Sequence, residues 1–105
     1  MYIAIYYFKT KEGQQDKFET AWAELTKLIY QHRNSLGSRL HKKNDVEYIA
    51  YAQWPDKATF YPEQPIEIPG AEKWRTMMRE ACEDIHTEHE LEVVDDLLKR
   101  EFYAN

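Results

Sequence analysis

Residues 2–8, YIAIYYF, decide the fold of this chain. The run is apolar throughout and rich in residues that favour strands, and a charged turn with Gly13 follows it. One side of such a strand would carry Tyr2, Ala4, Tyr6 and Phe8, and the other Ile3, Ile5 and Tyr7. A strand with one solvent-exposed face has polar residues at every second position. We therefore expect a strand that is buried on both faces.

Two stripes of apolar residues predict helices. The first comprises Phe18, Ala21, Trp22, Leu25, Leu28 and Ile29, at steps of three and four residues. It predicts an amphipathic helix over residues 14–32, which Asn34, Ser35 and Gly37 end. The second stripe comprises Ala71, Trp74, Met77, Met78, Ala81 and Ile85. It follows residues 61–70, an irregular segment with three prolines that could form a lid.

Further strands complete the pattern. Residues 38–43 form a short polar strand, Asn44-Asp45 signals a turn, and residues 46–54, VEYIAYAQW, form the next strand of a hairpin. Pro55-Asp56-Lys57 ends that strand and opens a short helical turn. Residues 89–94 predict a last strand at a sheet edge. The tail, residues 95–105, is either a final helical turn or an arm that packs on a partner.

The order βαββαβ predicts one α+β domain over residues 1–105, with its core in residues 2–94. We expect a ferredoxin-like antiparallel sheet in the order 4-1-3-2, with two helices on one face. Those helices leave an apolar face uncovered, and the same face of a second copy is the simplest cover. Basic residues 39–43 and acidic residues 88–92 lie on opposite predicted edges, where they either meet across a homodimer or stay solvated and block aggregation.

Composition excludes several classes of protein. The 105 residues carry a net charge of −5 with no long basic run, which argues against nucleic acid as a partner. No stretch approaches the ~20 apolar residues of a membrane span. The lone Cys82 cannot form an internal disulfide and fits a reducing compartment, so we expect a cytoplasmic protein. His86 and His89 have carboxylates nearby and could share a metal on a helix, but on a strand they would face opposite ways. We can place no third and fourth ligand, so we expect no metal site.

Three segments carry a resemblance to a known family: residues 18–22, FETAW, residues 36–41, LGSRLH, and residues 51–57, YAQWPDK, with Phe60. Together they resemble the antibiotic biosynthesis monooxygenase domain, of the dimeric α+β barrel group, from Tyr2 to about Val94. The resemblance implies a homodimer with a pocket in each subunit between helices and sheet. It also implies oxygenation of phenols or anthrones without metal or flavin, although other members oxidise quinols or cleave haem.

Haem cleavage fits this chain poorly. Members that cleave haem have a histidine on the second helix and usually an asparagine on the first strand. Here the first strand has no asparagine, and only His86 lies near the predicted end of the second helix. We therefore expect no haem and no other cofactor.

Cofactor-free oxygenation needs apolar walls, a hydrogen bond to an oxyanion and a proton acceptor. His41 is the candidate acceptor of a phenolic proton, and Arg39 the candidate partner of the anion. Alternatively, both are solvated or lie at a dimer edge. The candidate substrate-binding residues are Trp54, Tyr51, Tyr7, Trp74 and Met78, each of which could instead be part of the core.

The expected function is oxidation of a small electron-rich aromatic or quinol by O₂. The alternative is a dimeric domain that binds a small apolar or aromatic molecule without catalysis.

Overall fold

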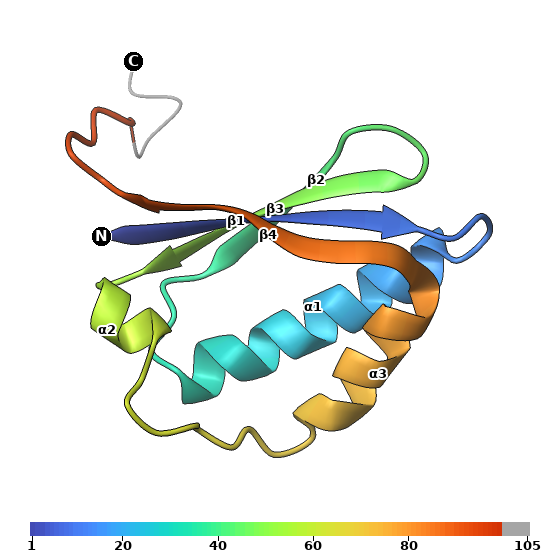
Figure 1. The fold of residues 1–105 in the computed structure, drawn as a ribbon, viewed down its shortest axis with the longest axis horizontal. Coiled ribbons are helices and arrows are strands. Elements are labelled where there is room, and N and C mark those ends of the chain that lie inside the picture. The colour runs from blue at the N-terminus through green and yellow to red at the C-terminus, as the bar shows by residue number, and fades with distance from the viewer. Residues whose placement is uncertain (100–105) are drawn as a thin grey trace.

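The computed structural model describes residues 1–99 (Figure 1). The elements, in chain order, are β1 (Tyr2–Thr10), α1 (Gln15–His32), β2 (Ser38–Lys42), β3 (Glu47–Trp54), α2 (Lys57–Phe60), α3 (Ala71–Ala81) and β4 (Cys82–Glu92). The strands form one antiparallel sheet in the order β2-β3-β1-β4. The predicted ferredoxin-like fold and strand order are confirmed.

The helices lie on one side of this sheet, and α1 and α3 pack side by side there (Figure 1). Because the helices cover only one side, burial alternates along β3. The residues that face the helices are buried, namely Tyr48, Ala50, Ala52 and Trp54, while the alternate residues are half-buried. We call the side toward the helices the inner face and the other side the outer face.

Phe18 of α1 is the centre of the packing between helices and sheet. Its side chain is fully buried, and its ring lies 4.9 Å from that of Phe8 and 4.8 Å from that of Tyr48. The Tyr48 hydroxyl donates a hydrogen bond of 2.5 Å to Glu19 at the helix edge. A cluster of rings at these distances stabilises the fold through its buried apolar area and through favourable ring geometry.

The second helix is shorter than the sequence pattern predicts. α3 ends at Ala81, and Ile85 lies in β4, which begins at Cys82 rather than near His89. β4 pairs with β1 along almost its whole length, from Tyr2 opposite Glu92 to Thr10 opposite Cys82. A strand that can pair with a buried neighbour satisfies its backbone groups there, and this outweighs a helical spacing that Ile85 matches by coincidence.

The outer face carries apolar side chains that the helices do not cover. Ile5, Tyr7, Ile49 and Tyr51 are half-buried, and Leu91 is 48% exposed. The predicted dimer would bury this face, and it stays a prediction because the structure contains one copy of the chain.

The chain beyond β4 forms neither helix nor strand up to residue 99. The predicted final helical turn is therefore absent from residues 95–99, and residues 100–105 lie outside the described residues. Leu97 is 91% exposed and Leu98 77%. In residues 1–99, no helix has both the length and the apolar character that crossing a membrane requires.

The buried ring cluster predicts a large loss of stability in Phe18→Ala. We expect the free energy of unfolding to fall by about 3–5 kcal/mol, because the substitution loses the transfer free energy of the ring and leaves a cavity in the core. Urea unfolding followed by circular dichroism measures it. Tyr30→Ala is the control, since Tyr30 is 58% exposed and its loss should cost no more than about 0.5 kcal/mol. Equal losses in the two variants would contradict this assignment of the core.

Candidate functional site

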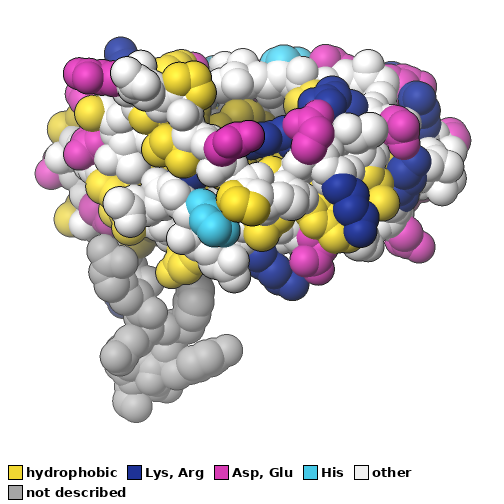
Figure 2. All heavy atoms as spheres, turned by 90° about the horizontal axis from the view of Figure 1, so that it is seen from below, with side chains coloured by type: hydrophobic (Ala, Val, Ile, Leu, Met, Phe, Trp, Pro, Cys, Tyr) yellow, Lys and Arg dark blue, Asp and Glu magenta, His cyan; other side chains and the backbone are white. Residues whose placement is uncertain are grey.

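A cavity of about 140 Å³ lies between the inner face of the sheet and the two long helices. Its lining residues come from three strands and two helices: Tyr6, Phe8, Trp22, Leu25, Thr26, Ile29, Ser38, Ala50, Ala52, Trp54 and Met78. Most are apolar. On the helix side of the molecule, hydrophobic side chains also appear at the surface between acidic and basic ones (Figure 2).

Small residues on β3 create the space. Ala50 and Ala52 occupy successive inward positions, and Ala4 on β1 lies opposite Ala52. Large rings flank them, with Tyr48 on one side and Trp54 on the other. Ala50 and Ala52 therefore form the floor of the cavity.

Trp54 places an unpaired donor in this region. Its side chain is 5% exposed, and its buried Nε1 has no hydrogen-bond partner among residues 1–99. The ring is held by an edge contact with Phe60 at 5.4 Å and by the Arg33 guanidinium 5.1 Å above it. A buried donor without a partner costs about 1–3 kcal/mol. An oxygen acceptor on a bound molecule would remove that cost.

Tyr6 supplies a second polar group to the cavity. Burial raises the pKa of its phenol to about 12, and the negative charge of Glu90 adds to the effect. Near neutral pH this hydroxyl is therefore a hydrogen-bond donor. Glu90 itself accepts hydrogen bonds of 2.6 Å from Tyr2 and from Tyr61, which lower the pKa of its carboxyl.

The structure divides the sequence-predicted site residues between the two faces. Trp54 and Met78 line the cavity, and Trp74 packs beside it against the cluster of Leu25, Ile68 and Ala71. Arg39, His41, Tyr51 and Tyr7 alternate with inward residues on their strands and so lie on the outer face. Within one chain, His41 and Trp54 therefore do not face the same space.

Arg39 and Tyr51 do come together. They are register partners on β2 and β3, and both line a hollow of about 200 Å³ on the outer face. Leu36, Gly37, Ser38 and Gln53 complete that hollow. His41 lies one outward position further along β2, with its Nδ1 3.1 Å from the carbonyl oxygen of Ile49.

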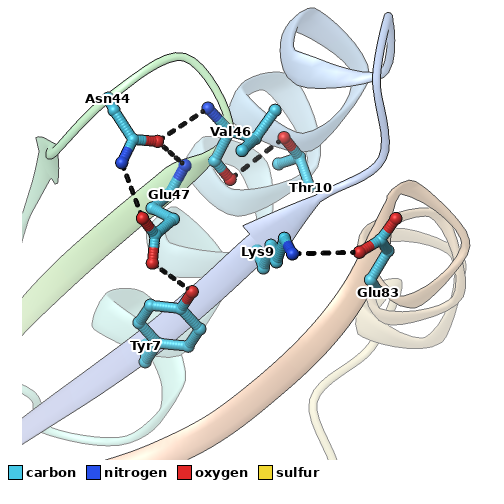
Figure 3. Close-up of polar contacts among 7 residues, drawn as sticks. All are labelled: Tyr7, Lys9, Thr10, Asn44, Val46, Glu47 and Glu83. Atoms are coloured by element: carbon cyan, nitrogen blue, oxygen red, sulfur yellow. Dashed lines mark hydrogen bonds and ion pairs between the residues drawn. The ribbon is translucent and has the colours of Figure 1, made fainter.

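Tyr7 belongs to a separate network at the hairpin (Figure 3). Its hydroxyl donates a short hydrogen bond to Glu47, which also accepts one of 2.6 Å from Asn44. The bond to Glu47 raises the pKa of Tyr7 to about 12. On its other side, the Tyr7 ring stacks on His86 at 5.0 Å.

The candidate metal ligands from the sequence form no centre. His86 and His89 both lie on β4, and no group of three possible ligands occurs within residues 1–99. Helix α3 carries no histidine, because His86 lies in the strand that follows it.

Sequence reasoning did not select several cavity residues. Trp22, Leu25 and Ile29 belong to the apolar stripe of α1, which shows that they face inward but not that space remains beneath them. Ser38 carries no chemical signal in the sequence at all. It reaches the cavity because the edge strand β2 begins beside α1.

The comparisons with known proteins agree with this architecture. The sequence pattern described as antibiotic biosynthesis monooxygenase matches residues 1–61, more than half of the chain. The chain belongs to the antibiotic biosynthesis monooxygenase family. The resemblance stated from the sequence is thereby confirmed, and the family pattern includes β1, α1 and the hairpin that together contribute most of the cavity lining.

Solved structures share the fold of this family member. SnoaB, a cofactor-independent oxygenase from Streptomyces nogalater, superposes with a TM-score of 0.71 at 18% identity, covering 93% of this chain and 98% of SnoaB. A candidate antibiotic biosynthesis monooxygenase from Deinococcus radiodurans gives 0.74 at 9% identity, covering 96% and 100%. Rv0793 from Mycobacterium tuberculosis gives 0.71 at 9%, covering 92% and 98%. Among curated proteins, none matches the sequence.

The outer-face network predicts a pH effect centred on His86. Its Nε2 lies 2.5 Å from Glu88 and its Nδ1 3.2 Å from Asp84, so Glu88 and then Asp84 raise the pKa of the imidazole. A raised pKa means that the protonated form stabilises the fold. That stability is present at low pH and is lost as the pH rises through the pKa of folded His86.

NMR titration of the imidazole signals tests this prediction. We expect His86 to titrate above the ordinary range and Glu88→Gln to lower its pKa. The matched control is Glu92→Gln, further along β4, which should leave it unchanged. A His86 pKa that is insensitive to Glu88→Gln would contradict the assigned cause.

Proposed function

We propose that this member of the family is a cofactor-independent monooxygenase that oxidises a small electron-rich aromatic or quinol in the cavity on the inner face. The observation that carries the proposal is the unpaired, buried N–H of Trp54 beside an apolar cavity. A phenolate oxygen is the kind of acceptor that this donor lacks. The fold shared with SnoaB, described as a cofactor-independent oxygenase, supports the same reaction type.

The proposed reaction requires little of the protein beyond binding the substrate and stabilising its negative charge. The substrate loses a proton, and its anion transfers one electron to O₂. The resulting organic radical and superoxide combine to form a carbon–oxygen bond and, after protonation, a hydroperoxide. Loss of water then leaves one oxygen atom on the substrate. Trp54 and Tyr6 would donate hydrogen bonds to the anion, and Met78, Phe8 and Ile29 would exclude water.

A catalytic role for His41 and Arg39 stays a prediction. Both lie on the outer face, so the role requires that part of the substrate reach the edge strand β2.

One observation favours the alternative function. The cavity lining contains no histidine, carboxylate or lysine that would accept a proton. A domain that only binds a neutral aromatic molecule needs no such group. We therefore keep a binding domain without catalysis as the second candidate.

Oxygen uptake under air with an anthrone or a hydroquinone separates the two candidates. We expect Trp54→Phe, which keeps a ring but removes the N–H, to lower kcat about a hundredfold. Trp22→Phe is the matched control, because it makes the same change in the cavity wall at a residue whose Nε1 is not a buried unpaired donor. It should reduce kcat only a few fold. Binding of these compounds without oxygen uptake would favour the binding domain.

We also propose that the outer face forms the homodimer that the family resemblance implies. Sedimentation velocity should show a dimer for the wild type and a monomer for Ile5→Lys, which places a charge in the centre of that face. Gln64→Lys, an equal charge change in the exposed loop after α2, should remain dimeric. A wild-type protein that sediments as a folded 12.7 kDa particle would refute this part of the proposal.

A further inference from the structure

The cavity on the inner face is lined by no charged side chain of residues 1–99. The proposed reaction nevertheless begins when a phenolic substrate loses a proton and becomes an anion there. Apolar surroundings disfavour that anion, because they separate its charge from water, and so they raise the pKa of a bound phenol. Ionisation near neutral pH therefore requires a positive charge close to the cavity.

Arg33, which directly follows α1, brings such a charge to the Trp54 end of the cavity. The carbon at the centre of its guanidinium lies over the Trp54 ring, 5.1 Å from the ring centre. The Arg33 side chain is half-buried, and its Nε is buried without a hydrogen-bond partner among residues 1–99. Arg33 also takes part in none of the ion pairs between those residues. No carboxylate partner therefore neutralises its charge.

Two backbone carbonyl groups fix the position of this guanidinium. Its Nη2 donates hydrogen bonds of 3.1 Å to the carbonyl oxygens of Thr59 and Phe60, at the end of α2. The Phe60 ring in turn makes an edge contact with Trp54 at 5.4 Å. Carbonyl groups carry no net charge, so these contacts orient Arg33 without neutralising it. A guanidinium does not lose its proton in proteins, so the positive charge is permanent.

Tyr6 shows that the charge of Arg33 acts on groups inside the cavity. Burial contributes most to the raised pKa of the Tyr6 phenol, and the charges of Glu90 and Tyr61 raise it further. Arg33 acts in the opposite direction and lowers that pKa. The guanidinium therefore favours the anionic form of a phenol in this cavity.

Glu90 supplies the opposing negative charge from β4. Its carboxylate accepts hydrogen bonds of 2.6 Å from the hydroxyls of Tyr2 and Tyr61. Trp54, however, lies on β3, and β1 separates β3 from β4 in the sheet. Arg33 lies directly over the Trp54 ring, so we expect an anion at Trp54 to interact more strongly with Arg33 than with Glu90.

We propose that Arg33, placed over Trp54, stabilises the anion of a phenolic substrate in the cavity, so that the substrate ionises there without a basic side chain. The O–H bond of the substrate breaks, its electron pair stays on the oxygen, and the proton passes to water. The oxygen then accepts a hydrogen bond from Nε1 of Trp54. This inference rests on the proposed function, since it assumes that the cavity binds the aromatic ring. Arg33 does not line the cavity and is therefore a positioning residue, which acts through Trp54 and through its charge.

Absorption titration of 4-nitrophenol bound to the full chain tests the proposal, with the protein in excess. The anion of this one-ring phenol is yellow, so its ionisation is measured apart from the absorption of Tyr and Trp. We expect the pKa of bound 4-nitrophenol to be about 1 lower than in water. Arg33→Gln should raise the pKa of the bound ligand by about 1, whereas Arg33→Lys keeps the charge and should retain most of the wild-type value.

Two further variants separate the charge from a general loss of structure. Lys27→Gln is the matched control, because it removes the same charge from α1, where Lys27 is exposed and paired with Glu24 at 3.5 Å. It should leave the pKa of the bound phenol unchanged. Glu90→Gln removes the opposing charge and should lower that pKa. Effects of opposite sign in Arg33→Gln and Glu90→Gln would identify charge as the cause, since a damaged cavity would shift both in the same direction.

The outcomes keep this inference apart from the proposed function. If the wild-type protein binds 4-nitrophenol without lowering its pKa, the inference is overturned, whether or not any variant folds. Equal pKa values in Arg33→Gln and Arg33→Lys would also overturn it. If 4-nitrophenol does not bind at all, the inference is again lost. In each case, oxygen uptake with an anthrone or a hydroquinone decides separately whether the proposed function stands.

Discussion

The pairing of β1 on both of its edges is the interaction on which the rest of the structure depends. β1 pairs with β3 on one side and with β4 on the other, and the pairing with β4 is irregular only between Ile5 and Tyr6 and between Lys9 and Thr10. Such a strand lies in the centre of the sheet and imposes its alternation on its neighbours. Its inward side chains define the floor against which α1 and α3 pack, and its outward side chains define the apolar outer face.

The same alternation separates two kinds of chemistry. On the inner face, alanines on β3 leave a cavity, and Trp54 and Tyr6 present donors to that region. On the outer face, Arg39 and Tyr51 share a hollow, and Tyr7 and His86 form a network with acidic residues. The sheet keeps these groups apart everywhere except at the start of β2. There Ser38 lines both the cavity on the inner face and the hollow on the outer face.

Much of the fold could be predicted from local pattern. The run at residues 2–8, the stripe of α1 and the hairpin turn at Asn44-Asp45 each identify an element without reference to the others. The boundary between α3 and β4 could not be predicted in this way, because Ile85 extends the helical stripe while only pairing with β1 assigns it to a strand. For the candidate site, the sequence predicts Trp54 and Met78 as substrate-binding residues, and both line the cavity. Ser38 also lines it, and nothing in the sequence points to that residue.

The sequence by itself determined the family, the order of the elements and the face of each strand that is apolar, because these follow from residue type and spacing along the chain. Only the tertiary structure decided which of the candidate residues share a space. The sequence makes both His41 and Trp54 candidates for the site, yet they lie on opposite faces of the sheet. The physical reason is that side chains alternate at every step of a strand, while the depth of a cavity depends on how far helices from distant parts of the chain stand above small residues such as Ala50 and Ala52.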